Sequence, residues 1–356
     1  MNAPRRVGRL PRLGAGAWTG IVVATAILAA IPLVSSNQYL LTVMVTALIT
    51  LVLNTSWNFV LGVAGAWNFG MLAIYAIGGY TAGLIMLHTG IPAWIAIPLG
   101  GVAAGGISVL LAFPTLRLFG IYTSLLTFSF AQVVQFVIVN NPKGLTGGTF
   151  GFPTVKGLYP SLGLLAQLRA YYWTVLAVVI VATFAVAKIR SSRLGIALQT
   201  IRDAPAYAAA RGVSPLKYRM LAFGISGSIA GVAGALYLSY NQSITSSVMG
   251  LTPLSIDVTM LVIGGLGTIF GPVLGTGLLT VIQQALIDYP GIQLTILGAI
   301  LLVIVVFVPN GLVGLIARIR RRIAGWVAEG EGLDDEDLQP AAAVTIDEPR
   351  PVDLPS

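Results

Sequence analysis

Residues 39–61 read YLLTVMVTALITLVLNTSWNFVL, and this stretch decides the character of the chain. It belongs to a longer run, from Leu13 to Leu116, that contains no Lys, Arg, Asp or Glu. A helix needs roughly 20 apolar residues to cross the hydrocarbon core of a bilayer, so the run holds several crossings. A β-barrel is disfavoured, because barrel strands alternate apolar with polar residues. The sequence therefore predicts an all-α polytopic membrane protein.

The composition of the whole chain agrees with this prediction. Of 356 residues, 56% are hydrophobic and 9% are charged, whereas soluble domains carry about 25% charged residues. This balance excludes a soluble enzyme and a disordered chain. The sequence has no cysteine and one histidine, which excludes disulfides, thiolate ligands and a cysteine nucleophile and argues against a histidine metal site. We expect no metal site, no cofactor and no catalytic residue.

Nine apolar segments follow one another, and the charges between them indicate their orientation. The segments are 17–34, 39–61, 71–87, 92–113, 119–139, 170–187, 218–239, 254–287 and 292–315. Lys and Arg are enriched in cytoplasmic loops, and they cluster before the first segment, at 188–219 and at 318–322. Placing all three clusters inside requires the 254–287 segment to cross twice or to be broken, and its centre is rich in glycine. We expect about ten crossings, both termini in the cytoplasm, and breaks at Gly264, Gly265, Gly267 and Gly271.

Charge also divides the chain into three parts. Residues 1–16 form a basic cytoplasmic N-terminus, and residues 17–316 form the transmembrane domain, whose first helix is expected to remain uncleaved. Residues 317–356 form a cytoplasmic tail that is first basic and then acidic. The last 28 residues hold nine acidic residues and one basic residue, a composition that favours a solvated, disordered segment. A partner-docking role for this tail is an alternative.

The sequence contains no recognisable source of energy for transport. A phosphate-binding P-loop needs Gly-Lys-Ser/Thr, and no lysine here follows a glycine. Proton-coupled transporters usually keep carboxylates or histidine inside the membrane. Only Asp257 and Asp288 lie within apolar segments, near predicted ends where we expect them to face water or headgroups. Transport driven by ions stays open, because a sodium site of backbone carbonyls leaves no such trace; a membrane-embedded enzyme is disfavoured.

The cytoplasmic stretch 191–219 reads SSRLGIALQTIRDAPAYAAARGVSPLKYR. Leu194, Leu198 and Ile201 recur at helical spacing and predict an apolar stripe. Asp203 is placed to cap a second short helix, which Gly212 ends. Such a pair of helices outside the bilayer can lie on lipid, fill a groove on a partner or serve as a structural elbow. The composition alone leaves these three roles open.

Glycine-rich stretches punctuate the chain at 62–70 (GVAGAWNFG), 144–151 (GLTGGTFG) and 264–271. Close helix packing and loop turns explain many of these glycines. The alternative is a solute path lined by exposed backbone, with Asn68 and Thr146 among its polar contacts.

Taken in order, these pieces resemble the permease subunits of branched-chain amino acid ABC importers, the LivM family. The similarity runs from about residue 53 to residue 315. It rests on Leu53-Asn54, Gly62-Val-Ala-Gly65, Asn68-Phe-Gly70, Gly78-Gly-Tyr80-Thr81, Pro114-Thr-Leu-Arg117-Leu-Phe-Gly120-Ile-Tyr122, Leu145-Thr-Gly-Gly148, Ser192-Arg-Leu-Gly195, Ile201-Arg-Asp203 and Gly264-Gly-Leu-Gly267. No single piece is specific, but their order is.

The resemblance implies a transport subunit of the bacterial inner membrane, with residues 17–316 as its permease domain. It implies a second, LivH-like permease subunit, two cytoplasmic ATPase subunits and a periplasmic substrate-binding protein, with lipid around the chain, a small-molecule substrate and no nucleic acid. Relatives carry branched-chain or other amino acids, urea, amides or aromatic acids, so the solute stays open.

The resemblance also assigns residues to roles. The coupling segment, 189–219, meets the ATPase through Arg193, Leu194, Gly195, Leu198, Ile201, Arg202 and Asp203, with the apolar stripe filling a groove on that partner. Asn54, Asn68 and Thr81 line the translocation path. Thr146, Gly147 and Gly148 face the binding protein or cap the outer mouth.

Overall fold

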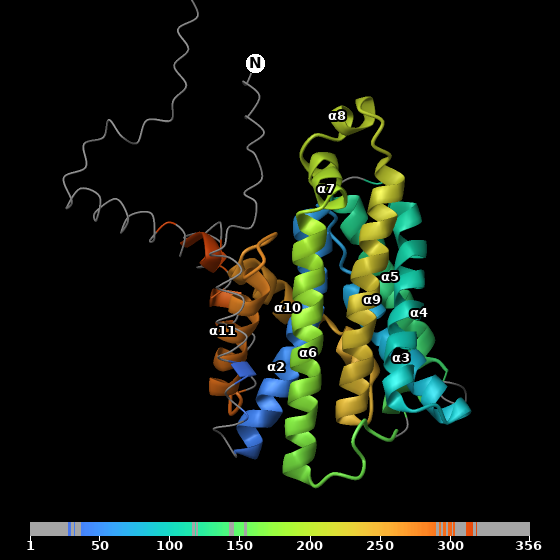
Figure 1. Cartoon of the computed structure of the whole chain (residues 1–356), viewed down its shortest axis with the longest axis vertical. Helices are drawn as coiled ribbons and strands as arrows, with labels where there is room; N and C mark the ends of the chain where they lie inside the picture. Colours follow the sequence, from blue (N-terminus) through green and yellow to red (C-terminus); the bar gives the residue numbers. More distant parts are fainter. Residues whose placement is uncertain are drawn as a thin grey trace, which may run out of the picture. The chain divides into compact units, whose positions relative to one another are not determined.

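The computed structural model describes residues 28–29, 32, 37–115, 118, 120–141, 146–152, 155–289, 292, 295–296, 298–300, 302, 311–315 and 318. Every regular element that it describes in these ranges is a helix (Figure 1), which confirms the predicted fold class. The helices detailed below belong to one compact unit, residues 1–314. Most of the predicted segments 17–34 and 292–315 lies outside the described residues, as do the basic N-terminus and the acidic tail.

Six of the described helices are long and apolar enough to cross a membrane. Their bounds agree with the predicted segments, except that one helix begins at Leu164 instead of residue 170 and so includes Arg169. The six are α2 (Gln38–Asn58) with its π-helical extension η1 (Phe59–Val63), α3 (Met71–Thr89), α4 (Ala93–Thr115), α5 (Ile121–Val139), α6 (Leu164–Arg190) and α9 (Pro215–Asn241).

Glycines allow α3, α4 and α9 to approach each other closely. A Cβ atom at Gly78 of α3 would overlap the backbone of Gly231 in α9, and one at Gly100 of α4 would meet the carbonyl oxygen of Gly78. Lipid tails are as apolar as the side chains, so helices in a membrane associate largely through such close contacts. Helix packing is therefore the reason for these glycines.

The predicted 254–287 segment is divided into α10 (Leu251–Gly264) and α11 (Gly271–Ala285). The two helices pack antiparallel, because Gly264 lies against Gly271 and Gly275 lies against Met260. Their turn contains Gly267, whose φ of 73° favours glycine. The turn lies beside η1, while the end of α11 meets the start of α2. The hairpin of α10 and α11 thus runs from one end of the bundle to the other and back, as predicted if segment 254–287 crosses the membrane twice.

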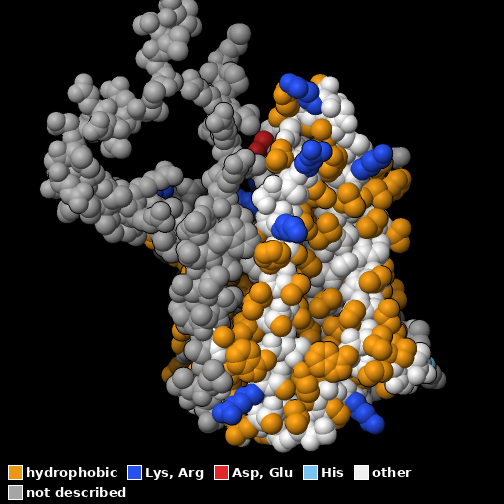
Figure 2. Space-filling view, viewed as in Figure 1, with side chains coloured by type: hydrophobic (Ala, Val, Ile, Leu, Met, Phe, Trp, Pro, Cys, Tyr) orange, Lys and Arg blue, Asp and Glu red, His pale blue; other side chains and the backbone are white. Residues whose placement is uncertain are grey.

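Two short helices, α7 (Arg193–Asp203) and α8 (Pro205–Ala210), lie beyond one end of the bundle (Figure 1). Two 3₁₀ turns, η2 (Gly148–Phe150) and η3 (Ser246–Met249), follow α5 and α9 at its other end. Hydrophobic side chains cover the flank between the two ends, and Lys and Arg lie near the ends (Figure 2). Exposed side chains such as Val102, Leu110 and Val181 fit a surface bathed in lipid.

Replacing Gly78 by alanine tests the packing of α3 on α9. We expect Gly78→Ala to lower the free energy of unfolding by about 1–3 kcal/mol, the usual effect of an overpacked core, and to lower the melting temperature of the purified protein in detergent. Gly106→Ala in α4 is the control, because a Cβ there meets nothing within 4 Å. Equal melting temperatures for the two variants would contradict the packing.

Candidate coupling site and solute path

The apolar stripe of α7 faces this chain's own bundle. Leu198 and Ile201 are 0% and 1% exposed, and Leu198 belongs to a cluster of buried side chains with Phe59, Val60 and Phe223. The expectation that this stripe fills a groove on an ATPase is therefore wrong for the structure described. The periodicity correctly showed that one face is buried, but it could not show which protein buries it.

The opposite side of the helix pair is open. Ile196 is 48% exposed and Tyr207 is 55% exposed, and the guanidinium of Arg211 lies 5.2 Å from the ring centre of Tyr207. Arg193 is also exposed, whereas Gly195 is buried where a Cβ would overlap carbonyls at the end of α6. These exposed residues form a surface that faces away from the bundle.

Asp203 does not cap α8 as predicted. The cap position is Ala204, and no side chain bonds to the start of that helix. Asp203 is instead the last residue of α7, and its Oδ1 accepts a hydrogen bond of 2.8 Å from Nε of Arg202. Gly212 does follow α8 with a φ of 75°, as expected for a residue that ends a helix.

Two arginines tie this segment to the interrupted helices. Nη1 of Arg202 in α7 donates to the carbonyl oxygen of Gly62 in η1. Nη1 of Arg190, at the end of α6, donates to the carbonyl oxygen of Gly267 in the turn between α10 and α11. The side chain of Asn58 joins the same place: its Oδ1 accepts from the amide of Gly267 at 2.7 Å, and its Nδ2 donates to the carbonyl of Thr268 at 2.7 Å.

We call this meeting point of Asn58, Gly62, Arg190, Arg202 and Gly267 the Gly62–Gly267 junction. A Cβ at Gly62 would overlap the backbone of Gly267, so the two chain segments touch through their main chains. A π-helical turn such as η1 often marks a functional position in a helix. The sequence did not reveal this junction, because Arg190 served only as an indicator of topology and its partner is 77 residues away.

Asn54 and Asn68 are both 0% exposed, but they perform different structural tasks. Nδ2 of Asn54 donates to Oγ1 of Thr276 at 3.1 Å, which joins α2 to α11. Oδ1 of Asn68 accepts from the amide of Gly70 at 2.9 Å and shapes the loop before α3. Each retains a buried amide atom without a hydrogen-bond partner, Oδ1 of Asn54 and Nδ2 of Asn68. Their place in a solute path stays a prediction.

The other predicted path residues lie apart from these two. Thr81 is half-buried in α3. Oγ1 of Thr146 donates to the carbonyl of Ile138 at 2.8 Å and so satisfies the end of α5. Gly147 precedes η2 and Gly148 is its first residue, with φ values of 71° and 62°. The role of Thr81 in the path stays a prediction, as does the role of Thr146, Gly147 and Gly148 at the outer mouth or against the binding protein.

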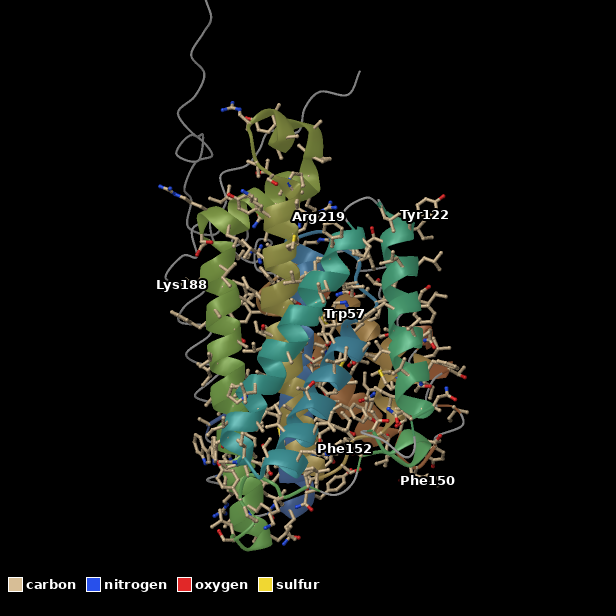
Figure 3. The ribbon with its side chains drawn as sticks, turned by 90° about the vertical axis from the view of Figure 1, so that its right-hand side faces the viewer. Trp57, Tyr122, Phe150, Phe152, Lys188 and Arg219 are labelled. Atoms are coloured by element: carbon tan, nitrogen blue, oxygen red, sulfur yellow. The ribbon has the colours of Figure 1, made fainter. Side chains whose placement is uncertain are left out.

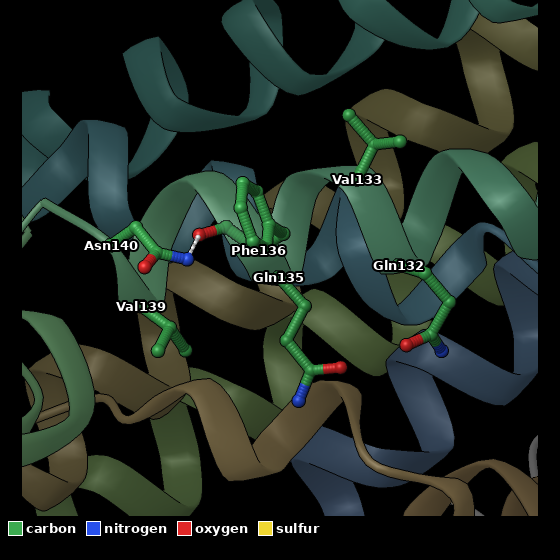
Figure 4. Close-up of a pocket in the computed structure, with 6 residues that line it drawn as sticks. All are labelled: Gln132, Val133, Gln135, Phe136, Val139 and Asn140. Atoms are coloured by element: carbon green, nitrogen blue, oxygen red, sulfur yellow. Dashed lines mark hydrogen bonds between the residues drawn. The ribbon is translucent and has the colours of Figure 1, made fainter.

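An open depression of about 500 Å³ lies on the surface of α5, lined only by that helix and its C-cap residue Asn140 (Figure 4). Its polar members are Gln132, Gln135 and Asn140. Nε2 of Gln135 donates to the carbonyl of Ser246 in η3 at 3.4 Å, and Nδ2 of Asn140 donates to the carbonyl of Phe136 at 2.9 Å. Gln132 stands where the family resemblance would place a Glu, and nothing in the structure assigns it a role.

A bundle of six long apolar helices, with a helical hairpin beside it and a short helix pair beyond one end, fits a membrane protein that crosses the bilayer several times. Residues 39–309 match the family model for the permease component of branched-chain amino acid transport systems. The chain belongs to this family and is a multi-pass membrane protein, as the sequence resemblance implied.

Two relatives support this membership. The chain is 27% identical over 307 residues to the high-affinity branched-chain amino acid transport system permease protein LivM of Escherichia coli K12, and 26% identical to the protein of the same name from Salmonella typhimurium LT2. Each alignment covers 80% of this chain and 72% of the relative. No solved structure matches the chain significantly.

Alanine substitutions on the two sides of α7 test which side belongs to the bundle. We expect Leu198→Ala to destabilise the isolated chain by about 2–5 kcal/mol, as for other large-to-small changes in a core, and to lower its melting temperature in detergent. Ile196→Ala, on the exposed side of the same helix, should leave the melting temperature unchanged. The reverse order would mean that the stripe meets another protein.

Proposed function

We propose that this chain is one of two permease subunits of an ABC importer and forms part of the path for branched-chain amino acids or a related small polar solute. The match to the permease family over residues 39–309 carries this proposal. Without a P-loop of its own, the chain needs two cytoplasmic ATPase subunits. A second permease subunit and a periplasmic binding protein complete the importer, and both termini of this chain face the cytoplasm of a bacterial cell.

The ATPase docks on the exposed side of α7 and α8. Ile196 and Tyr207 offer apolar area there, and Arg193 and Arg211 offer charge. Because Leu198 and Ile201 anchor α7 in the bundle, a force applied to the exposed side displaces the helix together with the bundle. The coupling segment predicted from the sequence keeps its role in this proposal, but a different face meets the partner.

The Gly62–Gly267 junction transmits the movement of α7 into the membrane domain. A shift of α7 moves Arg202, and with it the carbonyl of Gly62 that Arg202 holds. Gly62 touches Gly267, so the shift reaches the turn between α10 and α11 directly. Coupling between ATP binding and solute transport requires two states of the protein that differ in their contacts at the ATPase and at the solute path. In this proposal, the Gly62–Gly267 junction is the contact that changes between those two states.

One observation favours the alternative, a secondary transporter that works without ATP. Asp257 is 7% exposed within α10, whereas we expected it to face water or headgroups at a membrane interface. A buried carboxylate in an apolar helix is typical of ion-coupled transporters. Asp288, the second acidic residue considered, is exposed as expected.

Reconstitution separates the two candidates. We expect liposomes that contain this chain with its ATPase, second permease and binding protein to accumulate [³H]leucine only when ATP reaches the ATPase. Liposomes with the chain alone should take up no leucine under a proton or sodium gradient. Gradient-driven uptake by the chain alone would establish the secondary transporter instead.

Substitutions at the junction test the transmission of movement. We expect Gly62→Ala to force η1 away from Gly267, and so to reduce ATP-driven uptake at least tenfold while the assembled complex still hydrolyses ATP. Arg202→Gln keeps both glycines and should also uncouple hydrolysis from uptake. Gly277→Ala in α11 is the control, because a Cβ there meets nothing within 4 Å. Unchanged uptake in both junction variants would contradict the proposed route.

A further inference from the structure

A shallow groove of about 330 Å³ lies between α6 and α9. The two helices stand side by side in the bundle (Figure 1), but they touch at few places, whereas α4 packs along much of α9. All seven residues that line the groove are alanine, valine or isoleucine, five of them from α6 and two, Ile229 and Val232, from α9. The groove therefore offers hydrocarbon surface and no polar side chain.

The groove opens on a flank of the bundle that faces lipid. Val181, one of its lining residues, is 67% exposed, and hydrophobic side chains cover the surrounding surface (Figure 2). Leu28, from the first predicted segment, lies elsewhere, because Tyr172 on the far side of α6 donates to its carbonyl at 2.6 Å. A helix of a partner is about 10–12 Å across and can insert only single side chains into such a groove, whereas the acyl chain of a phospholipid can lie along it.

The side of α6 that lines the groove leads to a lysine. At about 100° per residue, Ala177, Val181, Ala185 and Lys188 lie within about 80° of one another around the helix axis. Lys188 is exposed and stands near the end of α6, where the chain turns into α7 (Figure 3). The groove thus continues, at the end of the bundle that carries α7, to a cationic side chain.

The side of α9 that lines the groove leads to a tyrosine at the same end. Tyr218, Ile225 and Ile229 lie within about 40° of one another around the axis of α9. Tyr218 is half-buried and packs against the cluster that contains Leu198 of α7. An apolar groove that ends between a lysine and a phenol hydroxyl matches a molecule with a hydrocarbon tail and a polar head.

Charge indicates which kind of head fits. Residues 188–219 contain seven Lys or Arg and one acidic residue, Asp203. Asp203 pairs with Arg202, and no ion pair joins Lys188 to another residue in the part of the chain that the structure describes. Clusters of Lys and Arg directly beside a membrane-spanning segment attract anionic lipids, and basic pockets between such helices bind their headgroups. This end of the groove therefore favours an anionic head over a zwitterionic one.

We propose that the groove between α6 and α9 binds an anionic phospholipid, with one acyl chain along Ala177, Val181 and Ala185 and the phosphate at Lys188. The ammonium group of Lys188 donates to the phosphate oxygens, while its aliphatic stem lies along the apolar helix. The hydroxyl of Tyr218 is a second donor. The inference depends on the membrane fold and not on the transport function, so it stands or falls separately from the importer.

Native mass spectrometry of the full chain in detergent tests the choice of headgroup. We expect phosphatidylglycerol to bind at least fivefold more tightly than phosphatidylcholine. Lys188→Gln should weaken phosphatidylglycerol about fivefold, the factor expected for one cationic side chain near a membrane surface. Lys217→Gln is the control, because it removes the same charge at the same end of the bundle, about 120° around α9 from Ile229. Equal affinity for the two lipids, or equal losses in the two variants, would overturn the proposal.

A second substitution tests the seat of the acyl chain. Ala185→Phe fills the groove and leaves Lys188 in place, so we expect it to weaken the binding of phosphatidylglycerol at least fivefold. Val102→Phe adds similar bulk at a position of α4 that is 69% exposed and should bind the lipid as the natural chain does. Unchanged binding by Ala185→Phe would mean that the lipid does not lie in the groove.

Melting temperatures give a readout that does not depend on mass spectrometry. A ligand that binds only the folded state stabilises it, so phosphatidylglycerol should raise the melting temperature of the natural chain and of Lys217→Gln, but not that of Lys188→Gln. An equal rise in all three would contradict a site at Lys188.

The assembled importer separates lipid from the other occupant of such a groove, a membrane helix of a partner subunit. We expect the complex to retain the bound phosphatidylglycerol and its sensitivity to Lys188→Gln. Loss of the lipid when the complex assembles would mean that a partner covers the groove, and the proposal would be wrong for the working protein.

Discussion

Inside a bilayer, every backbone N–H and C=O group that leaves a helix must find a partner within the protein, because lipid offers none. In the described part of the chain, the loops 64–70 and 265–270 leave such groups between helices, and side chains supply partners at both. Asn68 and Thr127 serve the first interruption, through the amides of Gly70 and Phe69. Asn58 and Arg190 serve the second, through Gly267 and Thr268.

The same requirement explains the attachment of α7 to the bundle. Arg202 reaches from α7 to the carbonyl of Gly62, a backbone group at the π-helical end of α2. An arginine that satisfies a backbone carbonyl cannot move without disturbing that carbonyl or leaving it unpaired. In the proposed mechanism, this hydrogen bond links a movement of α7 to the π-helical end of α2.

The sequence predicted what depends on composition and local spacing. The uncharged run from Leu13 to Leu116 indicated the membrane fold, and the glycines at 264–271 indicated where a long apolar segment turns back. The period of Leu194, Leu198 and Ile201 indicated a helix with one buried face. What buries that face depends on Phe59 and Phe223, which are far away in the sequence, so the spacing alone left the partner open and the family resemblance pointed to the ATPase.

Contacts across long sequence separations were beyond prediction for the same reason. Arg202 and Gly62 are 140 residues apart, and neither shows a local pattern that marks it as half of a pair.

The burial of Leu198 has a consequence for the order in which the protein is synthesised and packed. Its neighbours come from η1, α6 and α9, and α9 leaves the ribosome after α7 has been made. Until Phe223 is in place, the apolar face of α7 lacks part of its packing partner. The final position of α7 is therefore set only after α9 has been made, because Phe223 completes the cover of Leu198.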